Sequence, residues 1–323
     1  MMRYSELGKT GLRLSHLSYG ASSLGSVFRA TTEKESCEAV EAAIEGGINF
    51  IDVSPYYGHY KAETVLGKAL RHIPRDKYYL STKVGRYGKD GTNTWDYSAR
   101  RVTASVYESM ERMGIDYIDL IQVHDIEFQA ARPGGLQLVV DETLPALVEL
   151  REKGVVGHVG ITDLQLENLK WVVEKCEAQT TPDQKPMVES VLNFCHYTLN
   201  DDSLKDYLDF FESHGIGVVN ASPLSMGLLS ERGVPAWHPA PRSLVEACQR
   251  AASHCRAKGY PIERLAMQFA ASNCSICTTL FSSANAANVR RNIQWACEEP
   301  DWSLVKEIKN IIGTQQRVTW ANS

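Results

Sequence analysis

Residues 34–58, KESCEAVEAAIEGGINFIDVSPYYG, contain one helix–turn–strand unit of this 323-residue chain. The spacing of apolar residues in Lys34–Glu45 predicts an amphipathic helix, and Gly46-Gly47 predicts its end, because glycine readily adopts a positive φ. The apolar run Asn49–Val53 then predicts a buried strand. A helix followed by such a strand is the repeating unit of α/β folds.

The same unit recurs along the chain. Short apolar runs predict strands near Leu17–Gly20, Asn49–Val53, Tyr78–Val84, Ile118–His124, His158–Thr162, Val188–Phe194, Gly217–Pro223 and Cys277–Phe281. Amphipathic stretches predict helices over Lys34–Glu45, Ala62–Arg71, Arg100–Met113, Glu142–Lys153, Leu166–Lys175, Ser203–Ser213, Leu244–Lys258 and Ala286–Cys297. Strands separated by single helices imply right-handed parallel crossovers, and this number of units in about 300 residues predicts a closed (β/α)8 TIM barrel.

An N-terminal β-hairpin is expected before the barrel, from Tyr4 to about Leu14, with its turn at Lys9-Thr10-Gly11. No long linker rich in Pro, Gly or Ser divides residues 1–323, so one domain is expected. An open doubly wound sheet is the alternative fold, and it usually carries a Gly-rich phosphate loop after its first strand. The segment Gly20–Gly25 lacks the G-x-G-x-x-G spacing, which favours the barrel.

Composition argues against several classes of protein. A charged fraction of 23% is ordinary for a soluble globular protein, and no apolar stretch approaches the length of a membrane span. With a net charge of −5, the chain is a poor general binder of polyanions, so no nucleic acid partner is expected. The N-terminus has no apolar signal segment, so the 8 cysteines are expected to be reduced thiols in the cytoplasm. The close pair Cys274 and Cys277 has no partner pair, so both are expected to be buried structural thiols.

Two inserts are longer than barrel loops require, Gln129–Val140 and Ser230–Arg242. Both follow predicted strands, so both are expected at the C-terminal rim, where barrel active sites form. Long ordered loops often act as lids or binding segments, and a tolerated surface insertion is the alternative for each.

Polar side chains end three consecutive predicted strands. Asp52 ends the second strand and precedes Tyr57, Lys83 ends the third strand, and His124 ends the fourth. Each has an ordinary structural explanation by itself, such as a lysine that extends to solvent. Together they predict proton transfer at a carbinol or carbonyl oxygen, because a nearby Lys⁺ favours a phenolate and lowers the tyrosine pKa. A single histidine without an adjacent thiol does not predict a metal site.

With these residues the chain resembles the aldo-keto reductase superfamily. The matching features are Asp52-x-x-x-x-Tyr57-Gly58, Lys83, His124, Gly160-Ile161-Thr162-Asp163, Ser222-Pro223-Leu224 and Asn292. The resemblance covers nearly the whole chain and implies a barrel with a nicotinamide cofactor extended across its rim. It implies that Tyr57 is the general acid/base and that His124 orients the substrate oxygen. It further implies that Lys83 lowers the pKa of Tyr57 and that Asp52 holds Lys83.

The resemblance also implies cofactor-binding residues, namely Gly20, Ala21, Ser22, Asp52, Thr162, Asp163, Asn193, Ser222, Leu224, Ser225, Gly227, Ser282, Ser283, Asn288 and Asn292. Thr162-Asp163 departs from the Ser-Asn that usually grips the nicotinamide carboxamide, and Ala221 replaces a stacking tyrosine. Relatives that use NADPH usually bind its 2′-phosphate with Lys and Arg after the eighth strand. The matching Ser282-Ser283 and Asn288 are uncharged, so NAD is predicted, and Arg291 is the residue that argues against it.

A narrower resemblance, to the L-galactose dehydrogenases of this superfamily, rests on the segments Gly20–Phe28, Ser54–Gly58, His124–Phe128, Cys195–Tyr197 and Trp237–Ala240. It implies NAD-dependent oxidation of the C1 hydroxyl of an aldose, with L-galactose converted to a lactone in ascorbate-type sugar metabolism. The implied substrate-binding residues are Tyr57, His124, Asp125, Arg86 and His59, with Glu127 and His238 as further contacts. Carboxylates accept hydrogen bonds from sugar hydroxyls, and the alternative for Asp125 and Glu127 is a structural cap or ion pair.

Three alternatives stay open at this point. The substrate is L-fucose or another sugar of the same ring configuration, or the protein is an NAD(P)H-dependent reductase of small aldehydes or ketones. A non-catalytic, nucleotide-binding regulatory subunit is the third, and it is disfavoured because all four catalytic positions are filled. The expected partner is a small-molecule sugar, and a monomer or weak homodimer is expected because no heptad seam is evident.

Overall fold

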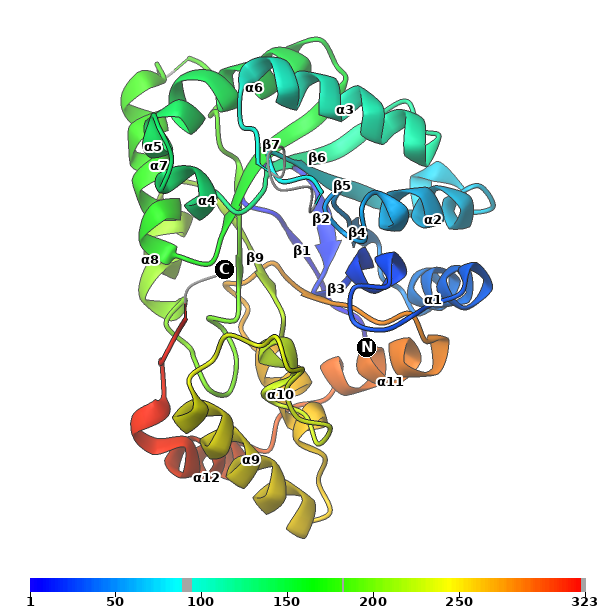
Figure 1. Ribbon diagram of the computed structural model, residues 1–323, viewed down its shortest axis with the longest axis vertical. Coiled ribbons are helices and arrows are strands. Elements are labelled where there is room, and N and C mark those ends of the chain that lie inside the picture. Colours follow the sequence, from blue (N-terminus) through cyan, green and yellow to red (C-terminus); the bar gives the residue numbers. More distant parts are fainter. Residues whose placement is uncertain (89–94, 182, 321–323) are drawn as a thin grey trace.

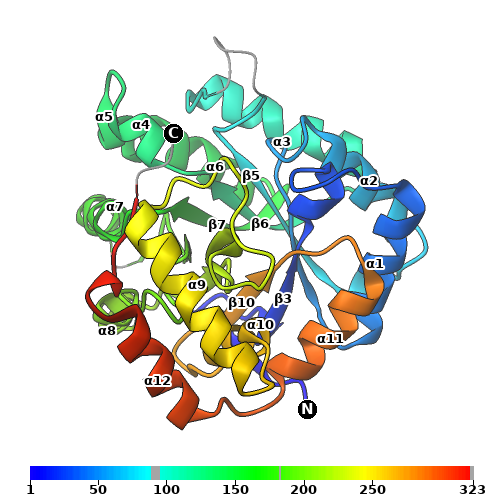
Figure 2. The same cartoon turned by 60° about the horizontal axis from the view of Figure 1, so that its bottom comes forward.

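The computed structural model describes residues 1–88, 95–181 and 183–320. Parallel strands close into a barrel in the order β10-β3-β4-β5-β6-β7-β8-β9, and helices surround it in Figures 1 and 2. The strands are β3 (Leu17–Gly20), β4 (Phe50–Asp52), β5 (Tyr79–Val84), β6 (Ile118–Val123), β7 (Val156–Asp163), β8 (Ser190–Phe194), β9 (Gly217–Ala221) and β10 (Thr278–Phe281). The predicted (β/α)8 barrel is therefore confirmed.

The predicted hairpin closes the N-terminal end of the barrel. Its antiparallel strands are β1 (Tyr4–Glu6) and β2 (Arg13–Ser15). Leu7 and Leu14 from the hairpin are fully buried against barrel-interior residues such as Phe50. Because this end is filled by apolar side chains, the opposite rim is left for polar chemistry. Cys277 is buried in the same cluster as predicted, but the prediction for Cys274 is wrong, because that residue lies in a turn and is exposed.

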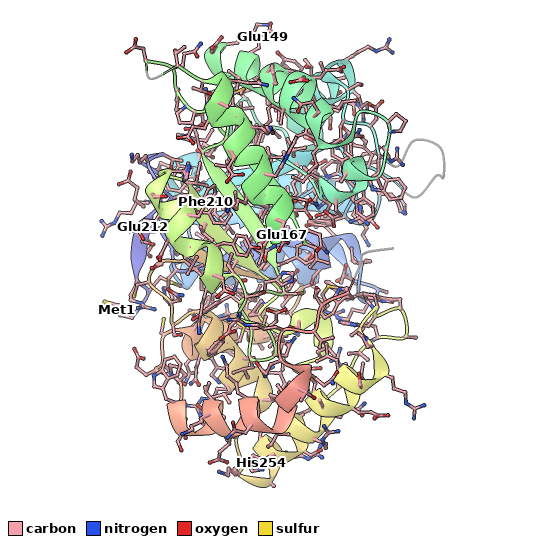
Figure 3. All side chains as sticks on the ribbon, turned by 90° about the vertical axis from the view of Figure 1, so that its left-hand side faces the viewer. Met1, Glu149, Glu167, Phe210, Glu212 and His254 are labelled. Carbon is pink, nitrogen blue, oxygen red and sulfur yellow. The ribbon has the colours of Figure 1, made fainter. Side chains whose placement is uncertain are left out.

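Most predicted helices form within a few residues of their expected bounds. They are α1 (Glu33–Glu45), α2 (Lys61–Leu70), α3 (Ala99–Met113), α6 (Leu144–Glu152), α7 (Leu166–Gln179), α8 (Lys205–Ser213), α9 (Arg242–Ala257) and α11 (Ala286–Ala296). Figure 3 shows the outer face of the ring, where Glu167 of α7 lies near Phe210 of α8 along a shallow groove. In the described part of the chain, no helix combines the length and apolar character needed to cross a membrane.

The prediction of one helix between the last two strands is wrong. A second helix, α10 (Ile262–Ala270), follows α9 and packs against α11, whereas α9 packs against the C-terminal α12 (Trp302–Ile312). Most residues of α10 are buried, but Glu263 and Arg264 give it a short polar face, so its sequence is amphipathic like that of the other helices.

The two inserts differ in structure. The first is largely helical, since α4 (Glu127–Ala130), α5 (Gly135–Leu138) and a helical stretch over Val139–Thr143 lead directly into α6. The second has no helix or strand before α9 begins at Arg242. Strand β9 also ends at Ala221, two residues before the prediction, because Ser222 adopts a left-handed backbone with a φ of 58°.

Candidate active site

A tight turn places Tyr57 at the C-terminal rim of the barrel. The Tyr57 N–H donates to the Ser54 carbonyl over 3.1 Å, with Pro55 at the second position of the turn, where its fixed φ is suitable. The next residue, Gly58, has a φ of 62°, and a Cβ there would lie 2.0 Å from the Gly25 carbonyl oxygen. Glycine at this position therefore allows the Tyr57 turn to contact the segment after β3.

Lys83, Asp52 and Tyr57 form one hydrogen-bonded group at this rim. The Lys83 ammonium forms an ion pair with Asp52 and lies 3.4 Å from Tyr57 Oη. It also donates to the Val53 carbonyl over 3.0 Å. Gln122 Nε2 donates to the second carboxylate oxygen of Asp52 over 2.9 Å. The structure thus brings together residues that the sequence placed on separate strands.

The charge state of this group follows from its burial. Burial raises the pKa of Tyr57 to about 12, although the positive charge of Lys83 acts to lower it. Burial alone would lower the pKa of Lys83, but the Asp52 carboxylate reverses the effect and raises that pKa above its usual value. The charge of Lys83 therefore acts on the Tyr57 pKa in the expected direction, but the effect of burial is larger. Tyr57 is therefore protonated at neutral pH.

His124 reaches the rim beside Tyr57. The two rings meet edge to face, with centroids 5.7 Å apart. The Tyr97 hydroxyl donates to the His124 carbonyl over 2.7 Å and fixes the backbone there. Burial lowers the pKa of His124 to about 3, so its imidazole is neutral at neutral pH.

Arg86 and Asp125 form an ion pair next to this histidine. Arg86 Nη1 lies 2.5 Å from Asp125 Oδ2, and the same oxygen is 3.5 Å from His124 Nε2. The guanidinium packs on the rings of Tyr56 and Phe128, at 3.7 Å and 4.5 Å from their centroids. Asp125 therefore takes the ion-pair alternative that the sequence left open. The exposed His59 also lies on this side, and its φ is 53°.

Thr162, Asp163 and Asn193 are buried, and their side chains bond to neighbouring loops. The Thr162 hydroxyl oxygen accepts from the Asp125 N–H over 2.9 Å. Asn193 Nδ2 donates to the carbonyls of Asp163 and the following residue, over 2.8 and 3.0 Å. Burial raises the pKa of Asp163 to about 6, and Glu127 hydrogen-bonds to it. These residues lie at the C-terminal ends of β7 and β8, and their buried side chains hold the neighbouring rim loops in place.

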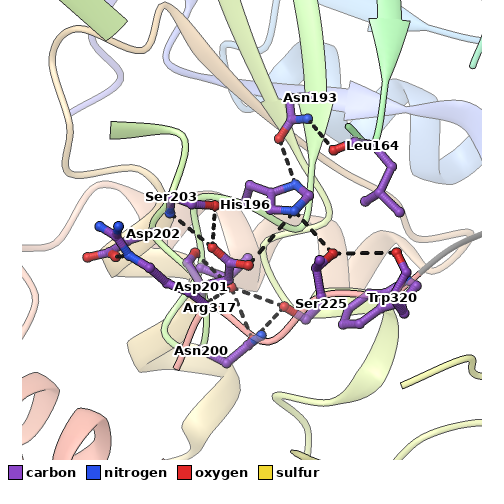
Figure 4. Close-up of polar contacts among 12 residues, drawn as sticks. Leu164, Asn193, His196, Asn200, Asp201, Asp202, Ser203, Ser225, Arg317 and Trp320 are labelled. Atoms are coloured by element: carbon purple, nitrogen blue, oxygen red, sulfur yellow. Dashed lines mark hydrogen bonds and ion pairs between the residues drawn. The ribbon is translucent and has the colours of Figure 1, made fainter. Parts of the chain in front are cut away.

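Figure 4 shows that Asn193 continues into a buried polar network. His196 Nδ1 lies 3.0 Å from Asn193 Oδ1, and His196 Nε2 lies 3.3 Å from the Thr319 hydroxyl near the C-terminus. The Ser225 hydroxyl donates to Asn200 Oδ1 over 2.6 Å. The network therefore connects the turn after β9 with the C-terminal segment, a link that the sequence did not reveal.

The turn after β9 has an unusual backbone. Positive φ values occur at Ser222, Ser225, Met226 and Gly227. Such conformations are uncommon outside glycine and often occur at ligand sites. Leu224 lies between them, partly buried. His238 Nε2 lies 3.0 Å from the Ser225 carbonyl, and its Nδ1 accepts from the Ala240 N–H over 3.1 Å, so this histidine braces the loop.

The start of α11 is suited to the phosphate and ribose part of a dinucleotide. Asn285 caps the helix by accepting from the Asn288 N–H over 2.9 Å, and Arg291 donates to Asn288 Oδ1 over 2.8 Å. The first N–H groups of a helix lack partners within the helix and attract phosphate. Residues 282–292 contain hydroxyls, amides and the cations Arg290 and Arg291 but no acidic side chain, so they can contact the phosphate and ribose groups of a dinucleotide.

The other predicted cofactor residues lie along the same rim. Ser282 Oγ donates to Ser23 Oγ over 2.7 Å, which joins the segments after β10 and β3. Gly20 ends β3, and Ala21 and Ser22 begin the following 3₁₀ turn, where Ala21 is buried. Ser283 lies just before α11, Asn292 lies within it, and both are partly exposed.

Sequence reasoning missed residues that hold the site together. Gln122 binds Asp52, and Ser54 contacts His124 Nδ1 at 3.0 Å. Both occupy positions two residues from a predicted catalytic residue. Because alternate residues of a strand share a face, this spacing was a usable signal. Tyr97, in contrast, lies on a loop with no such pattern.

Comparisons with known proteins agree with this geometry. Residues 16–312 match the model of the aldo/keto reductase family. An L-galactose dehydrogenase from Arabidopsis thaliana is 40% identical over 97% of this chain and 95% of that protein. A D-threo-aldose 1-dehydrogenase from a Pseudomonas species is 29% identical over 92% of this chain and 94% of that one. The holo form of an aldo-keto reductase from Bacillus halodurans shares the fold, with a TM-score of 0.76 and 24% identity over 98% of this chain and 100% of that chain.

Proposed function

Because the chain belongs to the aldo/keto reductase family, we propose that it oxidises the C1 hydroxyl of an aldose to a lactone with NAD. The observation that carries the proposal is the 3.4 Å contact between the charged Lys83 ammonium and Tyr57 Oη, beside a neutral His124. The similar sugar dehydrogenases support a sugar substrate, and L-galactose is the first candidate. We assign the enzyme to ascorbate-type sugar metabolism in the cytoplasm.

The residues around Tyr57 determine how the proton moves. A bound nicotinamide would supply the acceptor for the hydride of C1. The Tyr57 phenolate takes the proton of the C1 hydroxyl, so the C–H and O–H bonds break as the lactone C=O bond forms. Lys83 stabilises the phenolate by charge, and Asp52 keeps Lys83 protonated and oriented. His124 donates a hydrogen bond to the reacting oxygen and holds it near Tyr57.

Arg86 supports the preference for a polyhydroxylated substrate. Its side chain is 13% exposed at the rim. The Tyr56 and Phe128 rings and the Asp125 carboxylate hold the guanidinium in place next to His124. A sugar hydroxyl near C1 can accept a hydrogen bond from this fixed donor. We place the sugar between Tyr57, His124 and Arg86, with His59 at its outer edge.

The preference for NAD rests on the start of α11. Arg290 lies 3.4 Å from Glu45, and Arg291 is bonded to Asn288. A 2′-phosphate would therefore have to compete with these contacts for either cation. Ser282, Ser283, Asn288 and Asn292 would hold the adenosine end, and the buried residues Thr162, Asp163 and Asn193 would shape the nicotinamide end.

One assay tests the proposal. The enzyme is given a panel of L- and D-sugars with NAD⁺ or NADP⁺, and the absorbance of the reduced cofactor is followed. The highest kcat/KM is expected for L-galactose with NAD⁺. A clear preference for NADP⁺ would contradict the cofactor assignment. Reduction of simple aldehydes that far exceeds sugar oxidation would contradict the substrate assignment and favour a carbonyl reductase.

A further inference from the structure

The two ring nitrogens of His124 have different neighbours. Nδ1 lies 3.0 Å from the Ser54 hydroxyl oxygen, whereas Nε2 faces Asp125 Oδ2 at 3.5 Å. Ser54 is fully buried, and the exposed fraction of His124 is 3%. A neutral imidazole carries one proton, so these neighbours determine which nitrogen donates and which accepts.

The hydrogen bonds of Ser54 define the direction of its contact with His124. The Tyr56 N–H donates to Ser54 Oγ over 3.1 Å, so that oxygen already accepts one bond. Among the described residues, His124 Nδ1 is the only acceptor within hydrogen-bond distance of this hydroxyl. A buried hydroxyl generally donates its proton. The Ser54 O–H therefore points at Nδ1, which must present a lone pair.

Asp125 independently favours the same proton position. A carboxylate can only accept, and Asp125 is held in the charged form by its ion pair with Arg86. A lone pair on His124 Nε2 would face this carboxylate at 3.5 Å and be repelled, whereas an N–H there is attracted. The donor Ser54 at Nδ1 and the acceptor Asp125 at Nε2 thus favour the same position of the imidazole proton.

We propose that Ser54 is a positioning residue that holds His124 as the neutral tautomer protonated at Nε2. The protonated Nε2, whose contact with Asp125 is long at 3.5 Å, can then donate to the reacting oxygen of a bound substrate. Without the Ser54 hydroxyl, the proton is free to move to Nδ1, and a lone pair would oppose that oxygen. This catalytic consequence rests on the proposed function, but the tautomer itself does not.

The tautomer can be measured by ¹⁵N NMR on the full-length enzyme labelled at histidine. A long-range ¹H–¹⁵N correlation separates protonated from unprotonated ring nitrogens, and a His124→Gln variant identifies the His124 signals. The wild type is expected to show an unprotonated Nδ1 and a protonated Nε2. Ser54→Ala is expected to show both tautomers. A wild-type His124 protonated at Nδ1 overturns the proposal.

Kinetics supply the second readout. Removing one net hydrogen bond corresponds to roughly a 3- to 10-fold change, so Ser54→Ala should lower kcat by about that factor with little change in cofactor KM. Ser54→Thr keeps the hydroxyl and should restore kcat toward the wild type. Ser18→Ala is the matched control, because its buried hydroxyl bonds to Thr278 within the barrel. Loss of stability alone would affect both alanine variants similarly.

The two proposals can fail separately. If no sugar is oxidised by any form of the enzyme, the proposed function is wrong, and the NMR measurement still decides the tautomer. If sugar is oxidised but Ser54→Ala leaves kcat and the His124 tautomer as in the wild type, the positioning role is wrong and the proposed function stands.

Discussion

The two sides of the rim use their polar residues in different ways. At the ends of β4, β5 and β6, the predicted catalytic side chains contact one another, as in the Lys83 contacts with Asp52 and Tyr57. At the ends of β7 to β10, predicted cofactor residues bond to loop backbone or to side chains outside the catalytic group, as Asn193 and Ser225 do. We propose proton transfer for the first side and cofactor binding for the second. Substitutions on the first side should therefore lower kcat, and those on the second should raise the cofactor KM.

The largest effect is expected for Tyr57→Phe. General acid–base catalysis typically contributes about 10²- to 10⁴-fold, so kcat should fall by a factor in that range. Cofactor affinity, measured by fluorescence titration, should stay the same. Tyr78→Phe is the matched control, because Tyr78 is buried immediately before β5, at the N-terminal end of the barrel. Near-wild-type kcat in Tyr57→Phe would show that another group moves the proton.

Lys83→Met should follow in size. It removes the charge that stabilises the phenolate and leaves Asp52 buried without its cation. Breaking a buried ion pair costs about 3–5 kcal/mol, so the free energy of unfolding should fall by that amount, and kcat should fall by about 10²-fold. Denaturant titration measures the first effect. Lys68→Met, at an exposed ion pair with Glu33, should cost at most about 1 kcal/mol. Equal losses in both variants would contradict the proposed role of Lys83.

The pH dependence should separate the two reaction directions. Oxidation needs the Tyr57 phenolate, and burial raises the pKa of Tyr57 to about 12 in the protein without ligands. Below that pKa the phenolate fraction rises tenfold per pH unit. The kcat/KM for sugar oxidation should therefore rise about tenfold for each pH unit near neutral pH. Reduction of an aldehyde needs the protonated tyrosine and should stay flat over the same range. Parallel profiles in both directions would exclude Tyr57 as the titrating group.

On the second side of the rim, Asn193→Ala should raise the cofactor KM. The side chain joins the backbone after β7 to His196, so its loss should loosen the nicotinamide end. Loss of hydrogen bonds worth about 1–2 kcal/mol corresponds to roughly a 5- to 30-fold effect, with a smaller change in kcat. Asn49→Ala, at the opposite end of the barrel, is the control. A drop in kcat without a change in cofactor KM would contradict the proposed difference between the two sides of the rim.

Arg291→Ala should have the smallest effect. If Arg291 serves mainly to bond Asn288, kcat/KM with NAD⁺ should change by less than about threefold. Activity with NADP⁺ should be low in both forms. A selective loss of NADP⁺ activity in the variant would show that Arg291 binds a 2′-phosphate.

The sequence predicted the parts of the molecule that depend on local periodicity. Short apolar runs predicted where the strands end, and Asp52, Lys83 and His124 were placed on one rim because the parallel strands of a barrel end at the same face. The ion pair of Arg86 with Asp125 spans 39 residues and depends on a left-handed Asp125. Long-range pairing of this kind leaves no periodic signal in a single chain.

Helix α10, in contrast, left a local signal. Its 9 residues are amphipathic and follow Pro261, but the expected pattern of a single helix between neighbouring strands left no place for it. The bond between His196 and Thr319 joins residues that are 123 positions apart and depends on where the C-terminal segment crosses the rim. The fold could therefore be predicted more fully than the long-range contacts that hold the site residues in place.

The contact between Gly25 and Gly58 has a consequence for protein engineering. A Cβ on Gly25 would lie 2.6 Å from the Tyr57 carbonyl oxygen, and one on Gly58 would lie 2.0 Å from the Gly25 carbonyl oxygen. The loops after β3 and β4 therefore have to be exchanged together when they are transferred to another barrel. A chimaera that exchanges either loop without the other would displace the turn that carries Tyr57, whereas an exchange of both preserves it.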